Sequence, residues 1–171
     1  SALIPSGSVI DYPLKTNNYH YEMELVVALN KPGFRVAEEE ADDLIFGYAC
    51  GLDMTRRDLQ LIAREVGRPW DLGKNFEESA VLSPIVPRSQ TGTVMEGQIE
   101  LRVDGETRQS SDLCMQIWNV REIIAHLSQF YHLQAGDLIY TGTPEGVGKV
   151  VSGNKIEGSI ERVGSIELWI K

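Results

Sequence analysis

The sequence predicts a mixed, β-rich α+β domain with a few short helices, and three observations support this fold class. Most apolar runs are short, rich in branched and aromatic residues, and bounded by turn-forming residues, as β-strands are. Only three segments repeat apolar residues at the spacing of a helix. The length of 171 residues, without repeats or low-complexity stretches, suits one domain with a sizeable core.

Strand and helix patterns alternate in the first third of the chain. A short strand is expected over residues 9–12, and a longer branched, apolar strand over residues 21–29. After a turn at Lys31-Pro32-Gly33, apolar residues at helical spacing predict a helix over residues 36–45. Residues 46–53 then return to an apolar strand.

A second helix is expected to follow that strand. Thr55, with Asp58 three residues later, fits a capped helix start. Gly67-Arg68-Pro69 fits the end of the helix. The apolar stripe of this helix is expected to consist of Leu59, Ile62, Ala63 and Val66.

Hairpins and one more helix are expected in the second half. Residues 83–87 are extended, and Asp104-Gly105, a dipeptide typical of two-residue turns, joins strands over residues 99–103 and 107–109. The remaining expected elements are a helix over residues 120–130, a strand over 136–140 and a hairpin of residues 156–160 and 165–170.

Acidic residues outnumber basic ones, and this balance argues against two kinds of anionic binding partner. The 25 Asp and Glu against 16 Lys and Arg give a net charge of −9, which argues against binding nucleic acid or an anionic membrane surface. No apolar run approaches the roughly 20 residues that span a bilayer, and none resembles a signal peptide. Cys50 and Cys114 lie far apart in apolar contexts, so we expect two buried, reduced thiols and a cytoplasmic protein.

Three carboxylates at strand faces and ends form a candidate metal site. Glu22 and Glu24 are two residues apart on a predicted strand, so their side chains share one face. Like charges held side by side favour protonation of one carboxylate or a cation between them. Asp53 closes another strand, and the three acids together suit a hard divalent ion such as Mg²⁺ or Mn²⁺. The alternative is a solvated strand face, with Asp53 as a helix-entry residue.

Polar residues downstream of Asp53 are candidates for substrate contacts. Arg57 can hold a substrate carboxylate as a bidentate fork, and Gln60 can donate to the same group. The alternative for Arg57 is a solvated helix charge. Lys74 lies in a semi-apolar loop that suits stabilisation of an enolate, and its alternative is a solubilising surface lysine. The adjacent Gly73 is expected to let the backbone approach a ligand.

A glycine-rich loop follows the strand that ends at Tyr140. Residues 141–148 contain three glycines, one proline and two threonines, Thr141 and Thr143, whose hydroxyls and neighbouring N–H groups can cradle an anion. The loop lacks the Gly-Lys-Ser/Thr ending and the Gly-x-Gly-x-x-Gly spacing of nucleotide sites. The alternative is a series of tight turns.

Four stretches, in order and over almost the whole chain, resemble the fumarylacetoacetate hydrolase family. They are residues 20–25, 47–60, 67–74 and 136–148. Two motifs are most similar to those of the acylpyruvate hydrolases within this family. These motifs are Leu52-Asp53-Met54-Thr55-Arg56-Arg57-Asp58-Leu59-Gln60 and Gly67-Arg68-Pro69-Trp70-Asp71.

The resemblance implies a fold, a metal and a set of site residues. It implies a β-roll of the fumarylacetoacetate hydrolase type, a homodimer, and Mg²⁺ or Mn²⁺ held by Glu22, Glu24 and Asp53. It also implies a catalytic Lys74 and three substrate-binding residues. These three are Arg57, Gln60 and Thr143.

The resemblance further implies a metal-dependent hydrolase that cleaves the C–C bond of a 2,4-diketo acid, an acylpyruvate such as fumarylpyruvate. The alternative is an isomerase or decarboxylase acting on hydroxymuconate derivatives or oxaloacetate, because these reactions also need an enolate on a metal. Family hydrolases carry a His-Glu pair in a lid upstream of the matching region. Residues 1–171 are therefore expected to form a single catalytic-type domain without that lid, and the second alternative is a lidless, non-catalytic metal-binding subunit.

Overall fold

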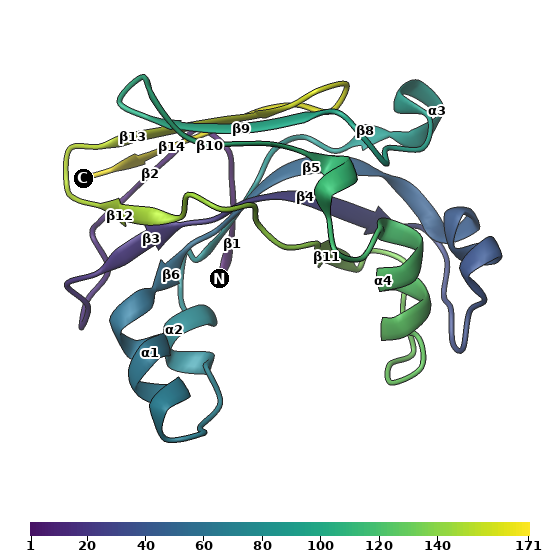
Figure 1. Cartoon of the computed structure of the whole chain (residues 1–171), viewed down its shortest axis with the longest axis horizontal. Helices are drawn as coiled ribbons and strands as arrows, with labels where there is room; N and C mark the ends of the chain where they lie inside the picture. Colours follow the sequence, from purple (N-terminus) through teal and green to yellow (C-terminus); the bar gives the residue numbers. More distant parts are fainter.

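Three β-sheets form the body of the molecule, and short helices project from two ends of it (Figure 1). The computed structural model describes all residues, Ser1–Lys171. The six-stranded sheet has the order β1 (Leu3–Pro5), β7 (Ala80–Leu82), β5 (Ile45–Asp53), β4 (Met23–Leu29) and β11 (Leu138–Tyr140), with β8 (Val86–Pro87) paired to β5.

The other two sheets complete this body. The five-stranded sheet has the order β10 (Glu106–Asp112), β9 (Gln98–Val103), β13 (Lys155–Ile160), β14 (Gly164–Ile170) and β2 (Ser8–Ile10). The three-stranded sheet has the order β12 (Gly148–Val150), β3 (Tyr19–Tyr21) and β6 (Thr55–Arg56).

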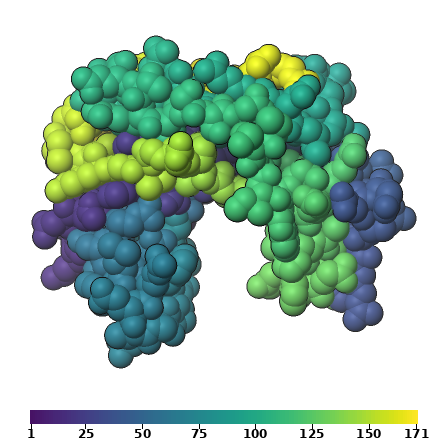
Figure 2. All heavy atoms as spheres, in the orientation of Figure 1, coloured from purple at the N-terminus to yellow at the C-terminus, as the bar shows by residue number.

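Two legs of helices stand on either side of a wide hollow (Figure 2). The first leg consists of α1 (Arg57–Glu65) and α2 (Asp71–Lys74), and the second leg consists of α4 (Val120–Leu127) packed beside the 3₁₀ helix η1 (Glu38–Leu44). The remaining helices are α3 (Arg88–Thr91) and the 3₁₀ helix η2 (Leu113–Met115). None of the helices combines the length and apolar character needed to cross a membrane.

One apolar core joins the two large sheets. Alternate residues of β4, from Met23 to Leu29, belong to a single buried cluster that also includes Leu101 of β9 and Leu168 of β14. Because successive side chains of a strand point to opposite faces, Glu22 and Glu24 lie on the face of this segment that points away from the core. The hydrophobic pattern therefore fixes which side of the sheet carries the acids.

The predicted β-rich class is confirmed, and most predicted elements are present. The hairpin of β9 and β10 turns at Asp104 and Gly105, whose φ angles of 51° and 82° are those of a two-residue turn of type I′. The final hairpin of β13 and β14 also lies where it was expected.

Two predicted elements differ in the structure. The expected strand over residues 21–29 is divided at Glu22, because β3 pairs with β6 and β12 whereas β4 pairs with β5 and β11. The expected helix over residues 36–45 is the 3₁₀ helix η1. The chain thus changes sheets at a glutamate, which local propensity alone does not predict.

The expected start and stripe of α1 were wrong. Thr55 lies in β6, and the N-cap position of α1 is Arg56, without a side-chain capping bond. In the expected apolar stripe, Ile62 and Val66 are 60% and 61% exposed, because α1 projects beside the sheets and packs mainly on α2. Of the two cysteines, Cys50 is buried as expected and Cys114 is exposed.

Asp42 ties the second leg to the body of the protein. Its carboxylate accepts from Arg121 Nε at 2.9 Å and Nη2 at 2.8 Å, and from Arg88 Nη2 at 3.0 Å. Hydrogen bonding from Arg121 holds the pKa of Asp42 below its ordinary value. One carboxylate therefore links η1 to both α3 and α4.

Replacing Asp42 with Asn is expected to lower the free energy of unfolding by about 1–2 kcal/mol at pH 7, because the amide carries no charge and has an NH₂ group in place of one of the two accepting oxygens. A lowered folded-state pKa stabilises the fold above the unfolded pKa of about 3.9 and loses this effect as pH falls through the folded value. Urea unfolding of both proteins at pH 7 and pH 3 measures the difference. Equal stabilities at pH 7 would contradict this role of Asp42.

Candidate active site

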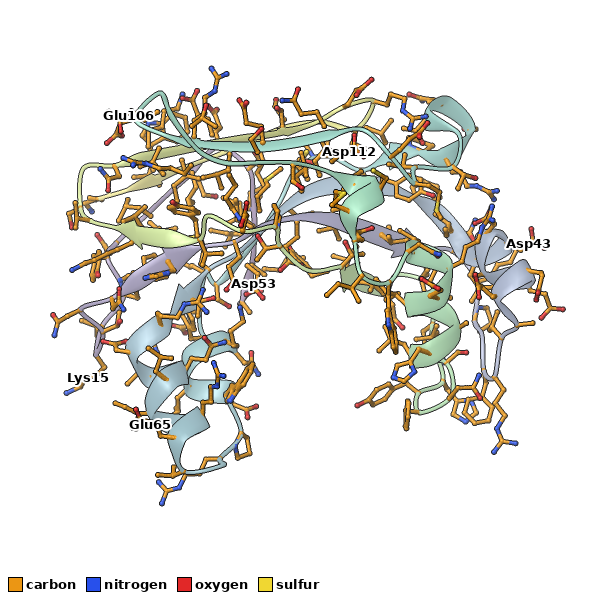
Figure 3. All side chains as sticks on the ribbon, in the orientation of Figure 1. Lys15, Asp43, Asp53, Glu65, Glu106 and Asp112 are labelled. Atoms are coloured by element: carbon orange, nitrogen blue, oxygen red, sulfur yellow. The ribbon has the colours of Figure 1, made fainter.

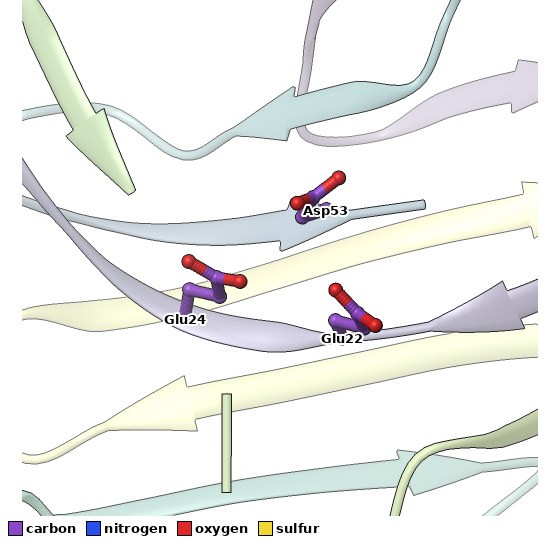
Figure 4. Close-up of side chains that lie close together, drawn as sticks. All are labelled: Glu22, Glu24 and Asp53. Atoms are coloured by element: carbon purple, nitrogen blue, oxygen red, sulfur yellow. The ribbon is translucent and has the colours of Figure 1, made fainter. Parts of the chain in front are cut away.

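β4 and β5 bring the three predicted metal ligands together. Glu22 immediately precedes β4, Glu24 lies within it, and Asp53 ends β5. The Asp53 N–H donates to the Glu22 carbonyl at 2.9 Å, which places these two residues opposite each other. One carboxylate oxygen from each of the three residues lies within 4.8 Å of the others (Figure 4). Asp53 lies at the inner root of the first leg, facing the hollow (Figure 3).

Burial makes this cluster costly without a cation. Glu22 and Glu24 are only 8% and 4% exposed. Burial raises the pKa of Glu24 to about 7, although the Gly142 N–H donates to its Oε2 at 2.7 Å. Burial also raises the pKa of Asp53, against the opposing effect of Lys74. Three carboxylates that converge in this way, two of them buried, are hard oxygen donors that fit a divalent cation.

Lys74 reaches the carboxylates from the first leg. Its Nζ lies 2.7 Å from Glu22 Oε2 and 2.7 Å from Asp53 Oδ2. α2 can pack this closely on α1 because Gly73 has no side chain, and a Cβ there would meet the Gln60 backbone nitrogen at 2.9 Å. The space at Gly73 is therefore filled by the α1 backbone and not by a ligand. This close packing places Lys74 beside the acidic cluster.

Arg57 binds Glu22 from the other side. Its Nη2 donates to Glu22 Oε1 at 2.5 Å, and its Nη1 donates to Gln60 Oε1 at 2.6 Å. Each terminal nitrogen retains a second N–H, so the guanidinium can hold Glu22 and still offer donors to a substrate carboxylate. Since the Gln60 oxygen accepts from Arg57, the amide of Gln60 presents its NH₂ group as a further donor.

Thr143 lies beside the cluster on the loop of residues 141–145. The preceding Gly142 donates to Glu24, and the Thr141 hydroxyl donates to the Leu25 carbonyl at 2.8 Å. The loop also forms one wall of a cavity of about 790 Å³, whose other wall includes Ile117 and Trp118. All the predicted site residues are therefore carried by β4 and the residue before it, by β5, by the first leg and by this loop.

Thr55 and Gln109, which reasoning from the sequence missed, have contacts at the site, and so has His20, which precedes the two glutamates in the sequence. Thr55 is fully buried and its Oγ1 accepts from Lys74 at 2.7 Å; its two-residue spacing from Asp53 on the chain was the available signal. His20 Nδ1 accepts from Arg57 Nε at 3.4 Å. Gln109 donates to the Thr143 hydroxyl from a distant strand, which no local pattern indicates.

Comparisons with known proteins identify relatives of this chain. The family model described as "Fumarylacetoacetate (FAA) hydrolase C-terminal" matches residues 1–170. A fumarylpyruvate hydrolase of Ralstonia sp. is 62% identical over 168 residues, which cover 98% of this chain and 87% of that protein. The mitochondrial oxaloacetate tautomerase FAHD1 of Homo sapiens is 39% identical over 171 residues, covering 100% of this chain and 77% of that protein.

The fold comparison agrees with these relatives. The crystal structure of fumarylpyruvate hydrolase from Pseudomonas aeruginosa in complex with Mn²⁺ and pyruvate superimposes with a TM-score of 0.96 at 48% identity. The match covers 99% of this chain and 74% of that chain. The family, the fold and the kind of enzyme predicted from the sequence are thereby confirmed. On the match of nearly all its residues, the chain belongs to the fumarylacetoacetate hydrolase family.

Proposed function

We propose that the protein is a Mg²⁺- or Mn²⁺-dependent hydrolase that cleaves the C–C bond of an acylpyruvate, with fumarylpyruvate as its principal substrate. The observation that carries this proposal is the convergence of three carboxylates within 4.8 Å, two of them buried, with a lysine and an arginine bound to the cluster. The 62% identity to a fumarylpyruvate hydrolase and the Mn²⁺ and pyruvate held by a structural relative support the same metal and substrate class.

Glu22, Glu24 and Asp53 would hold the ion. A bound divalent ion would supply Lewis-acid polarisation of a ketone oxygen and a template for the substrate. Burial of Glu22 and Glu24 limits the access of water to this part of the site, which strengthens the electrostatic contacts made there. The cluster therefore provides both the binding site and its low-dielectric surroundings.

Lys74 is the residue placed to stabilise the leaving group. In the proposed reaction, water adds to the distal ketone, the bond between that carbon and the adjacent CH₂ breaks, and its electron pair forms the enolate of pyruvate. The enolate carbon then takes up a proton, giving pyruvate and a carboxylic acid. The Lys74 ammonium, fixed at the edge of the cluster by Thr55, would donate to the enolate oxygen as negative charge develops.

The second candidate function is tautomerisation of oxaloacetate. The 39% identity to the human tautomerase favours it, and enolate stabilisation by the same residues would serve this reaction also. The two reactions differ in outcome: hydrolysis breaks a C–C bond and releases pyruvate from fumarylpyruvate, whereas tautomerisation only moves a proton.

Incubation of the chelator-treated protein with fumarylpyruvate and added Mn²⁺ or Mg²⁺ tests the proposal. Pyruvate is measured by coupling to lactate dehydrogenase, and enol–keto conversion of oxaloacetate is followed by ultraviolet absorbance. We expect metal-dependent pyruvate release at a higher kcat/KM than oxaloacetate conversion. Tautomerisation without cleavage would favour the second candidate, and metal binding without either reaction would favour a non-catalytic metal-binding subunit.

The proposal includes a cytoplasmic homodimer. Two free cysteines, one of them exposed, are compatible with a reducing compartment. Met115 and Ile117 are 73% and 96% exposed beside the cavity, and exposed apolar groups of this kind occur at subunit contacts. Light scattering coupled to size-exclusion chromatography measures the assembly, and a mass of one chain would remove the dimer from the proposal.

A further inference from the structure

Gln109 is a buried polar residue in the middle of β10. Its side chain is 1% exposed, whereas the residues on either side of it are exposed. The pairing of β10 with β9 shifts between Thr107 and Gln109, so Arg108 is the extra residue of a β-bulge. A bulge redirects the side chains that follow it, and bulges are frequent next to functional sites. Here the bulge directs an amide into the interior.

The amide of Gln109 connects the acidic cluster to the loop of residues 141–145. Its Oε1 accepts from the Met23 N–H at 3.1 Å, and Met23 lies between Glu22 and Glu24. Its Nε2 donates to Thr143 Oγ1 at 2.9 Å and to the Pro144 carbonyl at 2.8 Å. One side chain therefore joins the strand that carries two of the acids to the loop that carries Thr143.

Two backbone groups fix the orientation of this amide. The Met23 N–H can only donate and the Pro144 carbonyl can only accept, so the oxygen of Gln109 must face Met23 and its NH₂ group must face the loop. The second proton of that NH₂ group then points at Thr143 Oγ1. The Thr143 hydroxyl is an acceptor in this bond and keeps its own proton for another partner.

The bulge and the loop are also fitted to each other. A Cβ on Gly146 would meet the carbonyl oxygen of the bulged Arg108 at 2.2 Å, so the loop can lie against the bulge only with glycine at this position. The Tyr21 hydroxyl donates to the Gly146 carbonyl at 3.1 Å. The close contact around Gln109 thus depends on both the bulge in β10 and the glycine in the loop.

We propose that Gln109 is a positioning residue that makes the Thr143 hydroxyl a hydrogen-bond donor toward the substrate and holds residues 141–145 against Glu24. The inference rests on the proposed function, because the carboxylate and ketone groups of a diketo acid are acceptors only. A threonine hydroxyl that is left with only its proton to offer is complementary to these acceptor groups. Specificity for acceptor groups at this position therefore originates in a strand that does not itself carry a metal ligand.

A double-mutant cycle tests the coupling of Gln109 to Thr143. Gln109→Met and Thr143→Val are each expected to lower kcat/KM for fumarylpyruvate by about 10- to 100-fold. Because one residue acts through the other, the kcat/KM of the double variant should be no more than about threefold below that of the less active single variant. Losses that multiply would overturn the proposal, as would wild-type activity of Gln109→Met.

Conservative variants separate positioning from a general loss of structure. Gln109→Glu keeps an acceptor for the Met23 N–H but its carboxylate offers only acceptors to Thr143, so its kcat/KM should be lowered at least as much as that of Gln109→Met. Thr143→Ser retains the hydroxyl and should restore most of the activity lost in Thr143→Val. Gln98→Met, at the exposed start of β9, is the matched control and should behave as wild type.

Amide hydrogen exchange without substrate gives a readout that is independent of turnover. Gln109→Met should accelerate exchange at Gly142, whose N–H binds Glu24, while Thr143→Val should leave it nearly unchanged. Unaltered exchange in Gln109→Met would overturn the positioning role. Accelerated exchange in a protein whose wild type cleaves no diketo acid would instead refute the proposed function and leave the positioning of the loop intact.

Discussion

Replacing Asp53 with alanine is expected to reduce divalent-dependent pyruvate release by at least about 1000-fold, which corresponds to about 4 kcal/mol of transition-state stabilisation. Asp53 is one of three carboxylates within 4.8 Å of one another, and it also binds Lys74 at 2.7 Å. The substitution therefore removes a metal ligand and one of the contacts that fix the lysine. Binding of Mn²⁺, measured by calorimetry, should weaken by at least about 10- to 100-fold in parallel.

Asp43→Ala is the matched control for this experiment. Asp43 is exposed on η1 in the second leg, and Figure 3 shows it on the far side of the hollow from Asp53. The control should retain wild-type activity and metal affinity. Asp53→Ala should retain its circular dichroism spectrum, because burial raises the pKa of this carboxyl and so opposes its charged form in the fold. A rate near that of wild type would remove Asp53 from the site.

Replacing Lys74 with methionine is expected to lower kcat by about 100- to 1000-fold, as removal of a charge-stabilising donor does in other enzymes. Methionine retains the apolar stem but cannot donate to an enolate oxygen. The same substitution should strengthen Mn²⁺ binding at pH 8, which lies above the pKa of about 7 of Glu24, because it removes a positive charge 2.7 Å from Glu22 and Asp53. Activity and metal affinity should thus change in opposite directions.

These opposite changes separate Lys74 from the metal ligands. Steady-state kinetics and a Mn²⁺ titration on the same preparation measure both quantities, with Lys31→Met, an exposed lysine in a turn, as the control. Weaker metal binding in Lys74→Met would mean that the ammonium holds the carboxylates in their arrangement. Unchanged kcat would show that it plays no part in stabilising the enolate.

Local sequence patterns predicted most of the strands and hairpins, but they did not predict which sheet each strand joins. The turn at Asp104 and Gly105 follows from the backbone freedom that these residues provide, and the structure has it where the pattern placed it. The division of residues 21–29 into β3 and β4 depends on which distant strands pair with each half. The exposure of Ile62 and Val66 depends likewise on where α1 stands relative to the sheets.

By itself the sequence determined that Glu22 and Glu24 share a face, that the domain is rich in β-structure, and which motifs tie it to its family. The reason is that strand periodicity and motif order are properties of neighbouring residues. Only the tertiary structure decided that Asp53 meets the glutamates, and that Lys74 reaches them from α2 through the space left at Gly73. The bridge from Gln109 to Thr143 spans 34 positions of the chain, and sheet pairing, packing and a β-bulge bring such distant groups together.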